Sequence, residues 1–190
     1  KFLDLYNNKL LLRSLINYSK ILPIKSFCVY KNEISLSVGL DFLKFILVFL
    51  KFNTFTQYRV LGSITGVDYS YNKFRFELNY DLLSVRYNNR VKIKICTNEI
   101  RGVDSCEKLF YSANWYECEI WDMFGVFFIH HSSLRRILTD YGFVGNPLRK
   151  DFPLSGFVEI RYNENQKRIL SEPLEFSQEY RTFNYSNPWD

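Results

Sequence analysis

The chain has 190 residues, with 47% hydrophobic and 24% charged side chains, which is the composition of a globular α+β protein. A core of this size excludes the small folds that need disulfides or metal ions for stability. The net charge of +5 is uneven, because residues 1–112 carry 17 basic and 9 acidic side chains whereas residues 113–190 carry 8 and 11. The basic part fits RNA, anionic lipid or an acidic protein partner.

Residue usage indicates the base composition of the coding genome, and the four cysteines indicate the redox state of the compartment. The chain has a single alanine but 18 phenylalanines and 14 tyrosines, a bias typical of an AT-rich genome, that of an organelle or of an AT-rich microbe. Cys28, Cys96, Cys106 and Cys118 include no C-x-x-C pair, so we expect small buried side chains in a reducing compartment.

The first part of the chain predicts helices and short strands. Residues 9–22 have helical leucine spacing, and residues 27–31 and 34–38 predict strands. Residues 41–52 are apolar nearly all round, which predicts a helix buried on more than one side. The longest apolar run, residues 45–50, is far shorter than a membrane span.

Three consecutive strands follow, at residues 59–68, 73–80 and 91–96, and they predict an antiparallel meander. Phe74, Phe76, Leu78 and Tyr80 share one face. Such aromatic residues also occur on RNA-stacking sheets, but a one-sided apolar face needs helices as its cover, so we favour a core. Residues 105–111 predict a short helix.

Residues 113–125 predict a helix that carries two carboxylates beside an apolar stripe. Glu117 and Glu119 lie near opposite edges of this stripe, so we expect both to be partly desolvated and to need partners. Gly125 suits a left-handed helix end. The stripe consists of Tyr116, Ile120, Met123 and Phe124.

Two adjacent arginines offer such partners. Ser132 or Ser133 can cap a short helix over residues 134–138 that contains Arg135 and Arg136. Our hypothesis is that one arginine pairs with Glu117 or Glu119 and the other serves a partner. The structural ion-pair candidates are Glu117, Glu119, Asp122, Arg135 and Arg136.

The last part of the chain has the character of a docking segment. Residues 148–156 are rigid and charged with an aromatic anchor, and residues 157–162 and 168–171 predict a hairpin. The tail exposes more aromatic residues than it can hide, as expected of a surface that a permanent partner covers. The docking candidates are Arg149, Lys150, Asp151, Phe152, Phe176, Tyr180, Phe183 and Trp189.

The region 113–157 resembles the signature of the 30-kilodalton subunit family of respiratory complex I. The matching pieces are E-x-E-x-x-D at Glu117, Glu119 and Asp122, the run at 123–128, LRRILTDYGF at 134–143 and PLRKDFPLSG at 147–156. The chain departs from the family at Cys118, where arginine is usual, at 130–132, where Asn-His-Pro is usual, and at Asn146, where histidine is usual.

The resemblance implies a cofactor-free scaffold in the quinone module of the peripheral arm, with no catalytic residue of its own. It supports electron transfer from NADH to ubiquinone coupled to proton translocation, while FMN, iron–sulfur clusters and ubiquinone belong to the complex as a whole. The implied partners are the 49-kilodalton subunit and other peripheral-arm subunits, with no nucleic acid. The implied location is peripheral to the membrane, on the matrix side of the mitochondrial inner membrane for an organellar gene, or on the cytoplasmic face for a bacterial one.

The sequence leaves two other classes of function open. Cys118 with His130 or His131 fits a nucleophile, or a metal site with Asp122, although structural histidines are the simpler interpretation. The basic half fits an RNA-binding protein, which leaves the signature region unexplained.

We therefore predict an α+β fold with a mixed, largely antiparallel sheet and helices packed on it. A short helical signature region and an extended C-terminal arm follow. The expected segments are an α+β domain at 1–112, the signature region at 113–156, and a hairpin with a partner-binding tail at 157–190.

Overall fold

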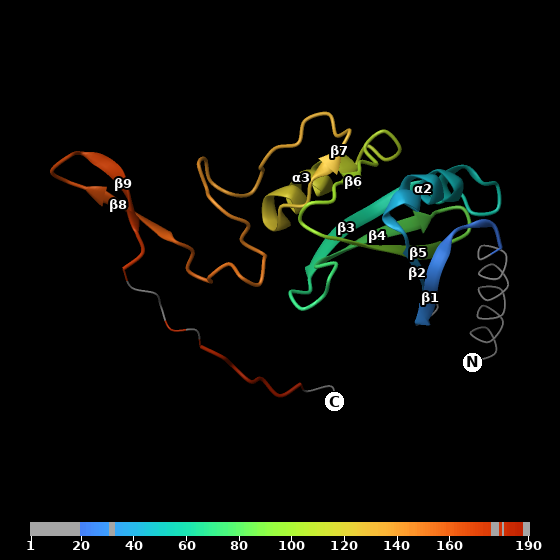
Figure 1. Ribbon diagram of the computed structural model, residues 1–190, viewed down its shortest axis with the longest axis horizontal. Helices are drawn as coiled ribbons and strands as arrows, with labels where there is room; N and C mark the ends of the chain where they lie inside the picture. Colours follow the sequence, from blue (N-terminus) through green and yellow to red (C-terminus); the bar gives the residue numbers. More distant parts are fainter. Residues whose placement is uncertain (1–19, 31–32, 176–178, 180, 188–190) are drawn as a thin grey trace. The chain divides into compact units, whose positions relative to one another are not determined.

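The computed structural model describes residues 20–30, 33–175, 179 and 181–187, and its contacts divide the chain into two units, Lys1–Lys150 and Asp151–Asp190. The first unit is built on a five-stranded sheet with the order β1-β2-β5-β4-β3 (Figure 1). Adjacent strands are antiparallel except β2 and β5, so the sheet is mixed and mostly antiparallel, as predicted. The strands are β1 (Ile24–Tyr30), β2 (Glu33–Val38), β3 (Val60–Asp68), β4 (Phe76–Ser84) and β5 (Asn89–Thr97).

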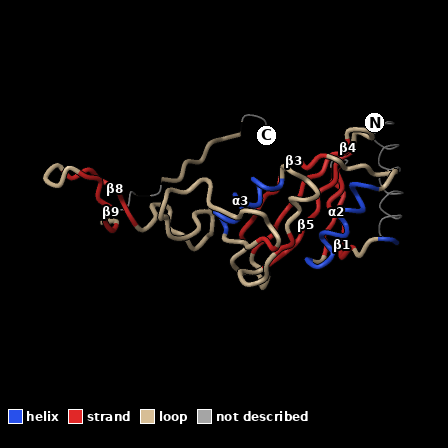
Figure 2. The backbone as a smooth tube through the Cα atoms, turned by 90° about the horizontal axis from the view of Figure 1, so that it is seen from above, coloured by secondary structure: helices blue, strands red, loops and turns tan. Residues whose placement is uncertain are grey.

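Two helices lie on one face of this sheet (Figures 1 and 2). Helix α2 (Leu43–Phe52) follows the 3-10 turn η1 (Leu40–Phe42), and helix α3 (Ala113–Phe124) packs on β3. The predicted α+β class is therefore confirmed. The helix predicted at residues 9–22 lies almost wholly outside the described residues.

The alternating pattern of β4 and β5 produces the core. Phe76, Leu78 and Tyr80 are at most 1% exposed, and they face inward with Ile93 and Ile95 of β5. These aromatic rings are under the helices and are not available for stacking on RNA bases. Phe74 was expected on the same face, but it lies in the loop before β4 and is exposed.

Helix α2 differs from its prediction. Leu43, Ile46, Leu47 and Leu50 recur at helical spacing and are buried in the core. The opposite side, which carries Phe45, is exposed, so burial on more than one side is wrong for the described chain.

The segment between β5 and α3 contains one short strand and several turns. Strand β6 (Val103–Asp104) pairs in parallel with β7 (Phe128–Ile129), which follows α3. The short helix predicted at 105–111 is wrong, because these residues form turns, with one α-turn bond from the amide of Phe110 to the carbonyl of Cys106 at 2.8 Å.

The second unit contains the predicted hairpin, β8 (Val158–Asn163) and β9 (Arg168–Pro173). Arg161 and Glu172 join its strands by a bidentate pair at 2.7 and 2.9 Å. The ring centroids of Phe152 and Phe157 are 5.2 Å apart.

Cys106 and Cys118 are buried as expected, whereas Cys28 and Cys96 are exposed. Within the described parts of the chain, no helix has the length and apolar character needed to cross a membrane.

Candidate functional site

The candidate site is the signature region, which is centred on helix α3. Glu117 and Asp122 are 0% exposed, although both are charged residue types. Glu119 is exposed, so its expected desolvation is wrong. Of the predicted apolar stripe, Ile120 and Phe124 are buried, while Tyr116 and Met123 are partly buried against the core.

Glu117 ties α3 to the loop after β6. Its carboxylate accepts hydrogen bonds from Ser105 Oγ at 2.6 Å, from the Cys106 amide at 2.8 Å and from Cys106 Sγ at 3.1 Å. Burial raises the pKa of Glu117 above its usual value, although these donors oppose the shift. The predicted arginine partner of Glu117 is wrong, because the loop donors occupy both carboxylate oxygens.

His131 completes this buried cluster. Its Nδ1 accepts a hydrogen bond from the amide of Ser133 at 3.1 Å, and its Nε2 lies 3.3 Å from the carbonyl oxygen of Asn114. Both ring nitrogens of His131 therefore have a partner inside the chain. Glu117 Oε2 is 3.8 Å from the same nitrogen.

The two alternative chemistries of Cys118 find little support in this geometry. Its sulfur lies 3.9 Å from His131 Nε2, but the residue is only 2% exposed and a substrate has no access. Among the residues that the structure describes, no three or more His, Cys, Asp or Glu side chains form a group able to hold a metal ion.

Asp122 organises the loop that follows β7. Its Oδ2 accepts hydrogen bonds from three consecutive amides, those of Ile137, Leu138 and Thr139, at 2.8–3.2 Å. Thr139 Oγ1 donates to Oδ1 at 2.7 Å, and Arg136 Nη1 lies 3.5 Å from the same oxygen. The hydrogen bonds outweigh burial, which acts in the opposite direction, and the pKa of Asp122 is lowered.

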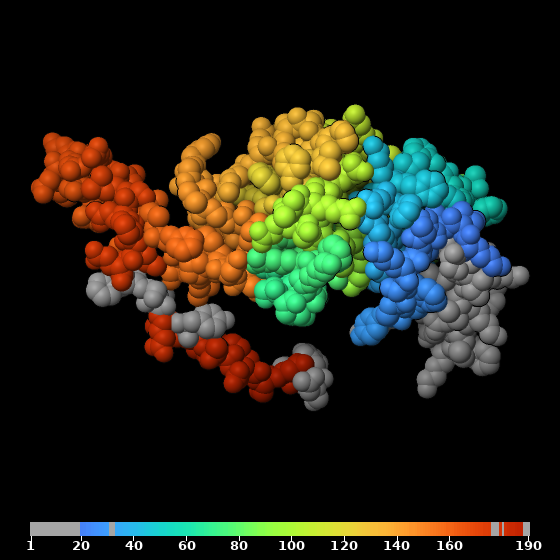
Figure 3. All heavy atoms as spheres, in the orientation of Figure 1, coloured from blue at the N-terminus to red at the C-terminus, as the bar shows by residue number. Residues whose placement is uncertain are grey.

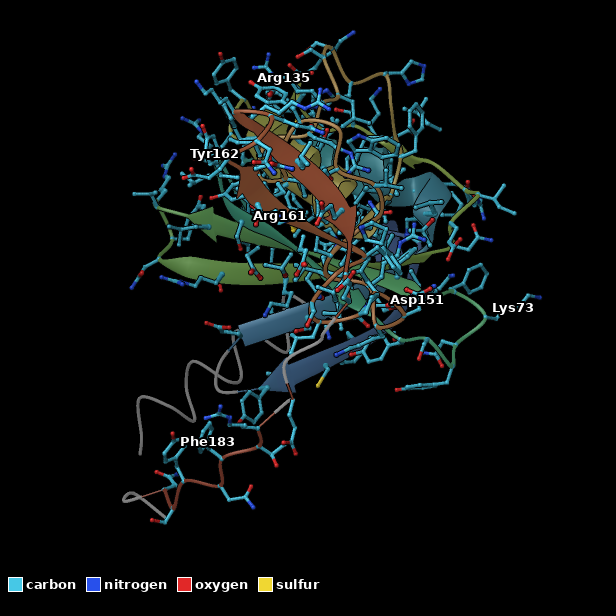
Figure 4. The ribbon with its side chains drawn as sticks, turned by 90° about the vertical axis from the view of Figure 1, so that its left-hand side faces the viewer. Lys73, Arg135, Asp151, Arg161, Tyr162 and Phe183 are labelled. Carbon is cyan, nitrogen blue, oxygen red and sulfur yellow. The ribbon has the colours of Figure 1, made fainter. Side chains whose placement is uncertain are left out.

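This arrangement replaces the helix predicted at 134–138, which is not formed. The amides that a helix would pair with its own carbonyl groups are bound to Asp122 instead. Ser132, one of the two expected caps, donates to Glu107. Arg136 therefore pairs with Asp122, and Arg135 is exposed at the surface (Figure 4).

The end of α3 is capped by residues 145–149. Gly125 adopts a left-handed conformation with φ 75°, as predicted. Asn146 Nδ2 donates to the carbonyl of Asp122 at 3.0 Å, the amide of Leu148 donates to that of Met123 at 3.1 Å, and Arg149 Nε donates to that of Phe124 at 2.6 Å. The last carbonyl groups of the helix are thus satisfied, and a positive charge stands at its C-terminus.

Arg149 also belongs to an ionic network with the end of β3. Arg75 forms a bidentate pair with Asp68 at 2.7 and 2.8 Å, and the amide of Lys150 donates to Asp68 at 2.8 Å. The hydrogen bond from Arg75 is the main reason that the pKa of Asp68 is lowered. Glu99 lies 2.9 Å from Arg75 and 3.4 Å from Arg149.

Glu107 was not predicted, yet it fastens the turn after β7 to α3. It accepts hydrogen bonds from Ser132 Oγ at 2.7 Å, from the Ser132 amide at 2.9 Å and from Asn114 Nδ2 at 2.6 Å. These donors, Ser132 first, lower its pKa to about 2. Its partners are distant in sequence, so spacing alone gave no sign of this role.

The docking candidates have varied environments. Arg149 is largely occupied inside the first unit, whereas the side chain of Lys150 is exposed. In the second unit Asp151 is exposed, Phe152 is half-buried and Phe183 is 66% exposed. Phe176, Tyr180 and Trp189 lie outside the described residues.

The fold and the site together define a class of protein: an α+β domain with a C-terminal extension, in which the motif acids hold loops in place. The chain belongs to the respiratory-chain NADH dehydrogenase 30-kilodalton subunit family, whose pattern matches residues 36–158. It is accordingly a subunit of the peripheral arm of complex I, NADH:ubiquinone oxidoreductase.

The curated relatives include subunits of NADH:ubiquinone oxidoreductase from several organisms. NADH dehydrogenase [ubiquinone] iron-sulfur protein 3 of Beta vulgaris is 55% identical over 150 residues, or 79% of this chain and 78% of that protein. NADH-ubiquinone oxidoreductase subunit 9 of Prototheca wickerhamii is 52% identical over 161 residues, or 85% and 84%.

A solved structure shares the fold. It is a chain of the membrane-bound sulfane sulfur reductase, an archaeal respiratory membrane complex, with a TM-score of 0.64 and 21% identity over 75% of this chain and 85% of that one.

Proposed function

We propose that the chain is a cofactor-free scaffold of the quinone-reducing module, docked on the 49-kilodalton subunit. It supports electron transfer from NADH to ubiquinone, coupled to proton translocation, by holding its neighbour in place. FMN, the iron–sulfur clusters and ubiquinone are bound by other subunits. The segments 1–112, 113–156 and 157–190 serve as sheet domain, signature region and partner-binding arm.

One observation carries this proposal: the carboxylates and the histidine of the signature region that could take part in catalysis form their hydrogen bonds within the chain. Glu117 binds the loop after β6, Asp122 binds the loop after β7, and the buried ring of His131 accepts a hydrogen bond from the Ser133 amide. Each group is already supplied with hydrogen-bond partners, as in a structural element. This supports a scaffold role rather than a catalytic one.

We propose that docking uses the segment after α3 together with the tail. Lys150, Asp151 and Phe152 provide the charges and the aromatic anchor, and Arg149 acts indirectly through its hydrogen bond to the end of α3. The ring of Phe183 is exposed, which supports the proposal that a partner subunit covers this part of the tail. Phe176, Tyr180 and Trp189 stay docking candidates on the basis of the sequence alone.

We further propose a location on the matrix side of the mitochondrial inner membrane. The relatives named above are subunits of a ubiquinone-reducing enzyme, and the AT-rich residue usage fits an organellar gene.

The test is to solubilise native membranes gently, separate the intact complexes, and measure with which complex the chain and its variants migrate. We expect co-migration with NADH dehydrogenase activity and the 49-kilodalton subunit. Lys150→Glu should release the chain from the complex and keep it folded, because the side chain is exposed. The matched control is Lys73→Glu, whose side chain extends from the β3–β4 loop (Figure 4). Assembly of Lys150→Glu at the control level would contradict the docking proposal.

A further inference from the structure

Helix α2 has two apolar faces, and only one of them is covered. Leu43, Ile46, Leu47 and Leu50 are at most 1% exposed in the core. On the outer side Phe45 is 54%, Val48 36% and Phe52 68% exposed. Their spacing of three and four residues places these outer side chains on one stripe.

The outer stripe continues beyond the helix. Phe42 of η1 is 47% and Phe55 is 85% exposed. Tyr87, from the β4–β5 turn, is joined to this end by a hydrogen bond from its hydroxyl to the carbonyl of Thr54 at 2.7 Å. We name the whole set the α2 aromatic patch: Phe42, Phe45, Val48, Phe52, Phe55 and Tyr87. Figure 3 shows the residues of α2 at the surface of the first unit.

The rim of this patch is positively charged. Lys44, Arg59 and Arg86 are exposed, and the guanidinium carbon of Arg86 lies 5.7 Å from the ring centroid of Tyr87. Asp41 is the one acid between residues 41 and 59, and it is neutralised by Arg101. A surface that meets this patch closely must therefore be acidic at its edge.

We infer that the α2 aromatic patch is a second interaction surface, which binds an apolar, acid-rimmed surface of another protein subunit of the complex. Interface cores are enriched in aromatic residues and have polar rims, as here. Lys51 and Arg101 are bound to Leu109 and Asp41. Among the described residues, this leaves Lys44, Arg59 and Arg86 as the exposed basic side chains of the rim, fewer than the clusters of about 4–8 that bind anionic membranes. The inference uses membership in the complex and is independent of the docking proposed for the tail.

The first experiment compares hydroxyl-radical labelling of the isolated full chain and of the intact complex. Phe45, Phe52 and Phe55 should react in the isolated chain and lose this reactivity in the complex, down to the level of the buried Phe76. Zero-length carbodiimide cross-linking of the complex should join Lys44 to an aspartate or glutamate of another subunit.

Four outcomes would overturn the inference. They are equal labelling in both states, protection already in the isolated chain, protection that is lost when lipid is removed from the complex, and cross-links of Lys44 only to this chain.

A variant pair gives an independent check on the assembled complex. Phe52→Ser should cause loss of the cross-linked subunit on native separation, whereas Tyr71→Ser, which removes an 81% exposed ring outside the patch, should retain it. Both side chains are exposed, so both variants should fold. Retention of that subunit by Phe52→Ser would refute the inference.

Discussion

At the scale of single residues, Gly125 and Gly142 have the same backbone conformation and different surroundings. Their φ angles are 75° and 74°. A β-carbon at Gly125 would lie 2.6 Å from Arg149 Nη2 and 2.8 Å from Asn146 Oδ1, whereas one at Gly142 would meet nothing within 4 Å. The first position combines strain with a clash, and the second has strain alone.

We therefore predict that Gly142→Ala costs about 1–2 kcal/mol of unfolding free energy, the usual cost of the left-handed conformation. Gly125→Ala should cost distinctly more, because it also displaces the side chains that cap α3. Urea unfolding of the two variants measures the difference. Equal losses would mean that Asn146 and Arg149 contribute little to the cap.

Two tyrosine hydroxyls provide a contrast of a different kind. The hydroxyl of Tyr80 is buried without a hydrogen-bond partner among the described atoms, and burial raises its pKa well above the ordinary value. The hydroxyl of Tyr116 donates to the carbonyl of Gly62 at 2.8 Å. A buried polar group without a partner keeps its full desolvation cost, whereas a hydrogen bond offsets that cost for a group that has one.

Tyr80→Phe should therefore leave the unfolding free energy unchanged or raise it by up to about 1 kcal/mol. Tyr116→Phe should lower it by about 0.5–1.5 kcal/mol. Thermal melts of both variants beside the parent protein test this order. Marked destabilisation by Tyr80→Phe would indicate a partner for that hydroxyl.

At the scale of elements, residues 134–148 form a loop because side chains compete successfully for their backbone amides. Leu134 packs partly against the core, whereas Arg135 and Leu138 are exposed. The three amides bound to Asp122 gain a charge-assisted acceptor, which is stronger than a helical carbonyl group. The helical pattern of the sequence was therefore misleading at this position.

Asp122→Asn should lower the unfolding free energy by about 1.5–3 kcal/mol, because it removes the charge from these bonds. It should also accelerate tryptic cleavage after Arg135 and Arg136, since the loop loses its anchor. Glu119→Gln is the matched control on the same helix, and its exposed side chain predicts a change within about 0.5 kcal/mol. Unchanged cleavage of Asp122→Asn would contradict the anchoring role.

At the scale of the whole molecule, the carboxylates divide into two groups with opposite effects on stability. The pKa of Glu107 falls to about 2 from an ordinary 4.5, so its contribution is present above pH 4.5 and is lost as the pH falls toward 2. Asp68 and Asp122, whose pKa values are also lowered, act in the same direction. Glu117, whose pKa is raised, acts in the opposite direction.

Above pH 4.5 the unfolded chain releases the Glu117 proton more readily than the folded chain does, so stability falls with pH until the folded pKa is passed. We predict that Glu117→Gln removes this fall. Urea unfolding between roughly pH 5 and pH 8 measures it, with Glu119→Gln as the control. Parallel profiles of Glu117→Gln and the parent protein would count against a raised pKa.

The sequence by itself determined the main strands, helix α2, helix α3 and its glycine end, the hairpin, and the family. These follow from local periodicity, from single-residue conformational preference and from a long contiguous motif. It also identified Glu117 as an acid that needs partners, but it made the same prediction for the exposed Glu119 and named Asp122 only as an ion-pair candidate.

Only the tertiary structure decided which partners those acids have. Ser105, Thr139 and Arg149 meet α3 from distant loops, and no spacing rule relates them to it. It also decided that one face of α2 remains exposed. Periodicity indicates that one face of a helix is apolar. Which surface covers that face depends on how the chain and the surrounding complex pack in three dimensions.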